Sequence, residues 1–195
     1  MSQEQFSSPQ DSLQLIESMI NKAQNRFNEN GHLYLLWGWV IFACSIIHFV
    51  VDHWKLYDNP QMVWFLTWGA LIYQTIYIAR RKKKERVRTY TDDIVGWVWV
   101  VFVILMALVG FITGKGNTWH LMYPLFLVLY GVPTFLTGVI IKFPALQVGA
   151  AGCWILAVAS TFVPVQFQVL FLALAVLSAW IIPGYLLRSR FKNQN

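Results

Sequence analysis

Residues 94–113 read IVGWVWVVFVILMALVGFIT and contain no charged side chain. An α-helix of about 20 apolar residues is long enough to cross the ~30 Å hydrocarbon core of a bilayer. The rest of the chain has the same character, because 57% of its 195 residues are hydrophobic and 12% are charged. Soluble domains carry roughly 25% charged residues. The composition therefore indicates an integral membrane protein.

Five further apolar segments flank this one, and turn-forming or charged residues separate them. Each segment is long enough to span a bilayer as a helix. The sequence thus predicts an all-α, polytopic membrane protein with six transmembrane helices in one domain, 32–188, between a cytoplasmic N-terminal segment, 1–31, and a cytoplasmic tail, 189–195. The predicted helices are Leu33–Val51, Gln61–Ala79, Ile94–Thr113, Trp119–Ile141, Ala145–Val163 and Val165–Leu187.

The last two segments are separated only by a short break at Pro164. Together they contain more apolar residues than one crossing accommodates, even in a tilted helix. We therefore expect a tight hairpin at Pro164. The first of the two also has small residues at four-residue spacing, from Ala145 through Gly149 and Cys153 to Ala157. Such spacing favours close helix packing in lipid, so we expect this helix to be the central one.

Lys and Arg are distributed unevenly between the two sets of alternating loops. Cytoplasmic loops of membrane proteins keep basic residues, whereas translocated loops are depleted of them. With six helices, 13 of the 15 basic residues fall on one side, and the other side holds only Lys55 and Lys115. The distribution predicts that both chain ends are cytoplasmic.

The fourth segment contains a predicted helix break at Pro133. Proline has no backbone N–H and its ring crowds the preceding turn, so a kink is expected. Broken helices form substrate sites in many transporters, but many are plain kinks whose freed groups are satisfied by Ser or Thr. The structural interpretation is the more common one. The residues of a possible substrate pathway are Gly131, Pro133, Thr134 and Thr137.

Four ionisable residues lie closest to the membrane interior, near the predicted outer ends of the helices: His48, Asp52, His53 and His120. Of these, His48, Asp52 and His120 lie at about the same depth. Imidazole and carboxylate groups are metal ligands, so these residues are the candidates for a metal site. The spacing matches no known metal motif, and we predict no metal and no cofactor. Since polar groups inside a bilayer are usually partnered, we expect His48 to hydrogen-bond with Asp52, one helical turn away.

Two elements on the predicted cytoplasmic side have sequence patterns suited to binding lipid or a protein partner. Residues Leu13, Ile16, Ile20, Ala23 and Phe27 follow helical spacing and predict an amphipathic helix, which would lie on the bilayer or dock on a protein partner. A basic cluster fixes the topology and is also suited to anionic lipid headgroups, whereas nucleic acid is not an expected partner. The cluster consists of Arg80, Arg81, Lys82, Lys83, Lys84, Arg86 and Arg88.

The stretches NGHLYLLWGW (30–39), YGVPTFLTG (130–138) and CWILA (153–157) resemble a family of small polytopic bacterial inner-membrane proteins that has no assigned activity. The resemblance implies a multi-pass protein of the cell inner membrane and supplies no catalytic residues. The residues themselves form no catalytic constellation, so an enzyme is not favoured. We expect a non-enzymatic sensor, scaffold or accessory subunit. The alternative is a transporter of small solutes or lipids with its site at the Pro133 break.

Overall fold

The computed structural model describes residues 31–84 and 90–192, which form helices joined by short turns, without a strand in these two ranges. The predicted N-terminal amphipathic helix, Arg86 and Arg88 lie outside the described residues. The elements are α2 (Gly31–His53), the 3-10 helix η1 (Pro60–Phe65), α3 (Leu66–Lys84), α4 (Tyr90–Lys115), the 3-10 helix η2 (Trp119–Leu121), α5 (Met122–Ile140), α6 (Pro144–Ser160), α7 (Val165–Val176), the π-helix η3 (Leu177–Ile181) and α8 (Ile182–Lys192).

Each of the six predicted segments is helical. Five described helices have the length and composition needed to cross a membrane, namely α2, η1–α3, α4, η2–α5 and α7–η3–α8. The sixth, α6, is an apolar helix of 17 residues, which is about 25 Å long at 1.5 Å per residue. It is separate from α7, since α6 ends at Ser160 and α7 begins at Val165. The described chain therefore has the all-helical architecture of a membrane protein.

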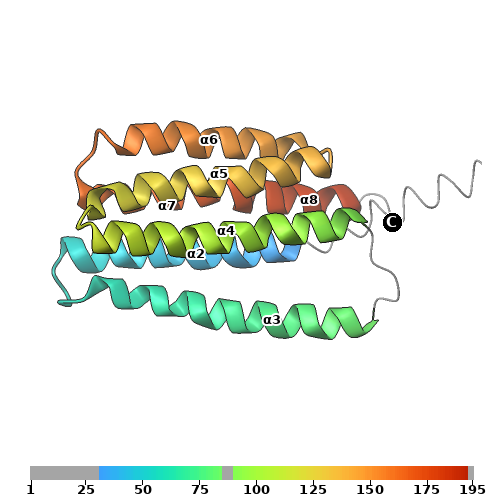
Figure 1. Cartoon of the computed structure of the whole chain (residues 1–195), viewed down its shortest axis with the longest axis horizontal. Helices are drawn as coiled ribbons and strands as arrows, with labels where there is room; N and C mark the ends of the chain where they lie inside the picture. Colours follow the sequence, from blue (N-terminus) through green and yellow to red (C-terminus); the bar gives the residue numbers. More distant parts are fainter. Residues whose placement is uncertain (1–30, 85–89, 193–195) are drawn as a thin grey trace, which may run out of the picture.

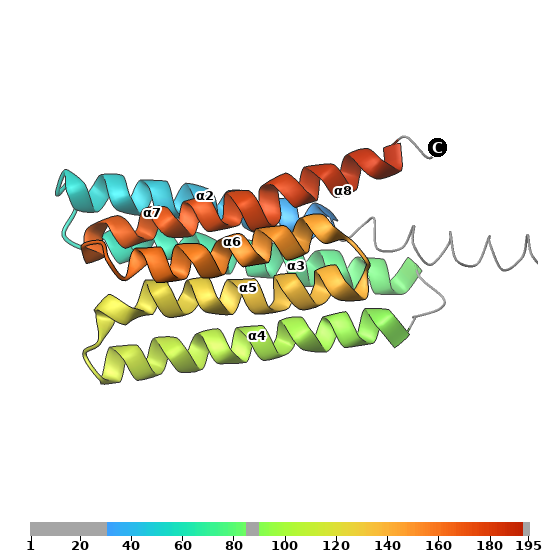
Figure 2. The same ribbon diagram turned by 90° about the horizontal axis from the view of Figure 1, so that it is seen from above.

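The helices lie side by side with their axes roughly parallel or antiparallel (Figure 1). Helix α3 forms one edge of the bundle and α6 the opposite edge, with the other helices between them (Figures 1 and 2). The expectation that α6 is the central helix is therefore wrong. Its small residues do bring it close to a neighbour, but Val148 and Ile155 on its other side are 73% and 70% exposed.

The last membrane helix changes direction at η3, so that α8 inclines away from α7 (Figure 2). Pro183 follows directly and is fully buried. Since proline cannot donate a hydrogen bond to the carbonyl four residues earlier, Ala179 loses its usual helical partner. A π-turn is one way in which a helix accommodates such a site. The wide turn directs Trp180 into the core, where it is 3% exposed.

Two helices contribute little to the buried interior. In the membrane-length segments of η1–α3 and α4, 6% of residues are buried, compared with 39% in α2 and 56% in α7–η3–α8. Helix α4 packs mainly on α5, through large side chains such as Trp99, Phe102 and Met106. Helix α3 packs mainly on α2. The core is thus built from α2, α5, α6 and α7–η3–α8, and α3 is attached to its side.

Candidate functional site

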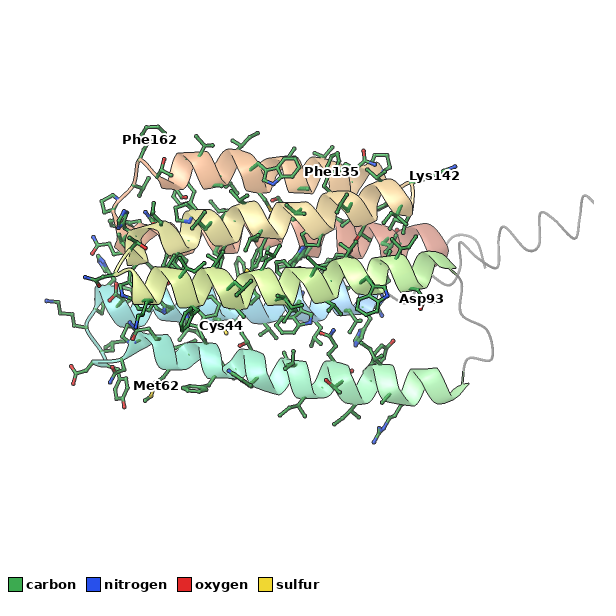
Figure 3. The ribbon with its side chains drawn as sticks, in the orientation of Figure 1. Cys44, Met62, Asp93, Phe135, Lys142 and Phe162 are labelled. Carbon is green, nitrogen blue, oxygen red and sulfur yellow. The ribbon has the colours of Figure 1, made fainter. Side chains whose placement is uncertain are left out.

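Helix α2 meets η1–α3 along four polar contacts, which we call the α2–α3 seam. From the end of the bundle where α2 begins to the opposite end, the seam joins His32 to Tyr73, Trp37 to Gln74, Cys44 to Val63, and His48 to Trp64. The Cys44 thiol donates to the Val63 carbonyl at 3.6 Å. Figure 3 labels Cys44 on α2 and Met62 in the facing η1.

The spacing along α2 explains why one side of this helix carries the seam. Trp37, Cys44 and His48 are seven and four residues apart, which places them on a single helical face. The beginning of α2 meets α3 at Tyr73 and Gln74, and the later part of α2 meets η1 at Val63 and Trp64, as expected for antiparallel elements. Inside a bilayer, hydrogen bonds between helices contribute to association because lipid offers no competing partner. The seam is therefore what holds α3 against α2.

His48 lies at the end of the seam near the C-terminal end of α2. The indole Nε1 of Trp64 lies 3.2 Å from Nδ1 of His48. An indole N–H can only donate, so Nδ1 carries no hydrogen and the imidazole hydrogen is on Nε2. Nε2 lies 3.4 Å from the hydroxyl of Tyr123 on α5. The neutral imidazole thus joins α2, η1 and α5, and a proton on Nδ1 would remove the acceptor that Trp64 uses.

The structure gives His48 partners from other elements in place of the Asp52 that spacing suggested. Helix α2 continues through His53, but Asp52 is exposed and forms no ion pair with His48. His120 is exposed in η2. Among the residues of 31–84 and 90–192, no three His, Cys, Asp or Glu side chains come together in a way that would hold a metal ion. The arrangement around His48 is a hydrogen-bonded junction between helices.

His48→Ala is expected to lower the free energy of unfolding in detergent by about 1–3 kcal/mol, because it leaves Trp64 and Tyr123 without their shared partner. Thermal unfolding of the purified protein measures this loss. Asp52→Asn is the matched control and should leave the melting temperature unchanged, since Asp52 is exposed. An equal loss in both variants would restore Asp52 as the partner of His48.

The Pro133 break is surrounded by aromatic side chains. Thr134 donates its hydroxyl hydrogen to the Tyr130 carbonyl at 2.7 Å and accepts the indole N–H of Trp180 at 2.9 Å. The Trp180 ring stacks on Tyr130, with centroids 4.8 Å apart. The Pro133 site in α5 therefore lies next to the π-turn, and α5 and η3 are joined by a hydrogen bond between buried side chains.

A second tryptophan covers the other side of this break. Trp154 of α6 donates its indole N–H to the Val128 carbonyl at 3.2 Å. Its ring lies against Gly131, where an added Cβ would come within 2.3 Å of the indole nitrogen. Gly131 therefore provides the space that Trp154 occupies. Pro133 and Thr134 are fully buried.

Thr137 and Tyr34 form a buried hydroxyl pair one turn beyond Thr134. The two side chains approach each other, but neither hydroxyl has a hydrogen-bond partner of normal geometry within the described part of the chain. Thr137 is 2% exposed and Tyr34 is 7% exposed. These groups are the least satisfied polar atoms near the helix break, and leaving such groups unpaired is costly.

The basic cluster begins at the end of α3. Arg80 is exposed there, close in sequence to Tyr77 and Tyr73. Tyr73 and Tyr77 stack on each other and both contact His32, which opens α2. Arg81, Lys82, Lys83 and Lys84 continue the last turn of α3, and their side chains lie outside the description.

Comparison of the chain with known protein families, with curated proteins and with solved structures found no match.

Proposed function

We propose that the protein is a non-enzymatic membrane sensor or accessory subunit in which η1–α3 is the element that engages a partner. The observation that carries the proposal is the attachment of α3, which is hydrogen-bonded along the α2–α3 seam but almost unburied. Side chains that could take part in catalysis, such as His48 and Cys44, form hydrogen bonds to neighbouring helical elements. This arrangement suits a binding or signalling role better than catalysis.

The free energy that the hydrogen bonds of the α2–α3 seam contribute is small, which is consistent with a change in the position of α3. Hydrogen bonds between membrane helices contribute about 0.6 kcal/mol each on average, so four such contacts amount to roughly 2–3 kcal/mol. Helix α3 adds few buried apolar contacts to this sum. The aromatic core around Trp180, by contrast, involves α2, α4, α5 and η3 but not α3. Moving α3 would therefore leave the core intact.

Helices α3 and α4 offer the surface for a partner. Their large apolar side chains are exposed over most of the length of both helices, so one side of the bundle is formed by helices with few internal contacts. Another membrane helix packing there would supply the burial that the chain itself does not provide. The exposed side chains of these two helices include Leu66, Trp68, Ile72, Trp97, Ile104 and Phe111.

A photo-crosslinking residue at Ile72 tests this function in native membranes. Ile72 on α3 is 61% exposed, and Val148 on α6, at 73% exposure, is the matched control on the opposite edge. We expect the Ile72 variant to crosslink to one protein in stoichiometric amount and the Val148 variant to crosslink only to lipid. Crosslinks to lipid alone at both positions, with the protein recovered without a partner, would contradict the proposal.

We further propose that both chain ends are cytoplasmic and that the protein resides in a bacterial inner membrane. The helix ends next to Arg80, Lys142 and Arg188 lie at one end of the bundle, whereas Lys55 and Lys115 lie at the other (Figures 1 and 3). This grouping of basic residues at one end supports the orientation.

Cysteine labelling tests the orientation. Cysteines introduced at Asn59 and Asn117, both exposed at turns, are expected to react with an impermeant thiol reagent applied to intact cells. A cysteine at Lys83 is expected to react only after the cells are opened. Native Cys44 and Cys153 are buried and give the background signal in the parent protein. Labelling of Lys83→Cys in intact cells would reverse the assigned orientation.

Transport through the Pro133 break is the less supported alternative. Trp154 and Trp180 occupy the two sides of the break, and Thr134 is fully buried between aromatic rings. A pathway at this place would require both rings to move. The kink is better explained as a packing feature that brings Thr134 to Trp180.

A further inference from the structure

We infer that the end of the seam where α2 begins is a binding site for the phosphate of an anionic phospholipid, formed by His32, Tyr73, Tyr77 and Arg80. These residues come from two helices, α2 and α3, and are placed together by the fold. The site is distinct from the general attraction of a basic cluster, because it adds aromatic hydroxyl and imidazole groups in a fixed arrangement.

The contacts within the cluster leave some of its polar groups without a partner. Nε2 of His32 lies 3.2 Å from the Tyr73 hydroxyl, and the His32 and Tyr77 ring centroids are 5.3 Å apart. Tyr73 and Tyr77 stack with an angle of 18° between their planes. Within the described ranges, Nδ1 of His32, the Tyr77 hydroxyl and the Arg80 guanidinium form no hydrogen bond or ion pair. They are therefore available to a ligand.

The spacing on α3 adds Arg80 to this group. Tyr73, Tyr77 and Arg80 are four and three residues apart, so they lie on one face of the helix. The face of α3 that contacts His32 through Tyr73 and Tyr77 therefore also carries the Arg80 side chain. Arg pairs well with phosphate, since its planar N–H groups match two phosphate oxygens. Hydroxyl and imidazole N–H groups supply further donors to the same anion.

A phosphate on a lipid fits the position of the cluster better than other ligands. A cationic headgroup would be repelled by Arg80 and the basic residues that follow it. Tyr73 is 46% exposed, and the neighbouring Ile72 and Ile76 expose apolar surface along α3. The acyl chains of a bound lipid would lie against this surface while the phosphate meets the polar cluster. Anionic lipids are recognised in this way by basic residues at the ends of membrane helices.

A lipid bound at this site would affect the contact between α2 and α3 in the seam. Tyr73 belongs to the site through its stack on Tyr77 and is also the seam partner of His32. Binding would therefore join the ends of α2 and α3 through a shared ligand. The inference rests on the proposed function in one respect, the assignment of this end to the cytoplasmic leaflet. Lipid binding in a nanodisc does not depend on orientation or on a protein partner, so its failure would leave those two proposals untouched.

Native mass spectrometry of the full chain released from nanodiscs tests the site. Nanodiscs contain phosphatidylcholine with or without phosphatidylglycerol, and retained lipid is counted for the wild type, Tyr77→Phe, His32→Phe with Tyr77→Phe, and Tyr185→Phe. Tyr185 is the matched control, because it is a tyrosine at the same end of the bundle that bonds Trp39 outside the cluster. Unchanged melting temperatures establish that each variant is folded.

We expect selective retention of one phosphatidylglycerol by the wild type and by Tyr185→Phe. Each donor removed from the cluster should weaken retention about tenfold, the effect of one lost hydrogen bond to a charged group. Equal retention in the double variant would show that general basic attraction suffices and would overturn the site. Complete displacement by inorganic phosphate would also overturn it, because the ligand would then be a free anion rather than a lipid.

Discussion

Replacing Gly149 with alanine is expected to destabilise the protein by about 2–3 kcal/mol, because the new methyl group has no space to occupy. A Cβ at this position would lie 2.6 Å from Cα of Ala179 and 2.6 Å from the Ser178 carbonyl oxygen. Both are backbone atoms of the π-turn, so no side-chain rotation relieves the overlap. Helix α6 would have to move away from η3. Thermal unfolding in detergent measures the loss.

Helix α6 also provides a control substitution, Gly152→Ala, which is not expected to destabilise the protein. A Cβ at Gly152 would lie 3.5 Å from Oγ of Ser178, which is an ordinary contact. Alanine has a helix propensity about 1 kcal/mol more favourable than that of glycine. Gly152→Ala is therefore expected to leave stability unchanged or to raise it. Equal destabilisation by the two substitutions would show that α6 does not approach η3 in the way the structure describes.

Trp180→Ala is the substitution with the largest expected effect, a loss of about 3–5 kcal/mol. It removes a buried ring that stacks on Tyr130, contacts Trp99 edge-on and donates a hydrogen bond to Thr134. These contacts join η3, α4 and α5. We expect the purified variant to unfold at a much lower temperature or to be recovered mainly as aggregate.

Trp180→Phe separates the packing of this ring from its hydrogen bond. Phenylalanine keeps an aromatic ring beside Tyr130 but cannot donate to Thr134. The expected loss is about 1 kcal/mol, the typical contribution of one hydrogen bond. The same unfolding measurement applies. A loss as large as that of Trp180→Ala would mean that the hydrogen bond, rather than the ring, holds the π-turn against α5.

The helical segments were predictable because each depends on a local property of the sequence. A run such as 94–113 is apolar regardless of which helices surround it, and α4 indeed covers this range. Turn residues at Pro164 separated the last two segments for the same reason. Local patterns also identified Pro133, which lies inside α5, since a proline differs visibly from its apolar neighbours.

The contacts of these residues were not predictable, because they join positions far apart in the chain. His48 has Asp52 on its own helical face, whereas its partners Trp64 and Tyr123 come from η1 and α5. Nothing in the spacing of these aromatic residues distinguishes them from tryptophans and tyrosines at a membrane boundary. The small-residue pattern of α6 predicted close packing, which Gly149 makes against η3, but it did not predict that α6 lies at an edge of the bundle.

Pro183 was the local signal for the π-turn that the sequence interpretation overlooked. It lies inside the last apolar segment, as Pro133 lies inside the fourth. Before Pro183 the helix widens into the π-turn η3, and Trp180 in this turn donates a hydrogen bond to Thr134. Thr134, which follows Pro133, and Trp180, which precedes Pro183 by three residues, thus meet in the core, and only the fold reveals this contact.

The α2–α3 seam also bears on how the chain enters a membrane. Of the five membrane-length helices, η1–α3 is the least apolar. A weakly apolar segment partitions poorly into lipid by itself, whereas a preceding helix that offers hydrogen-bond partners lowers the cost of its polar groups. Helix α2 is made first and presents Trp37 and His48 to the segment that follows. We therefore expect α2 and α3 to enter the bilayer together as a hairpin during synthesis.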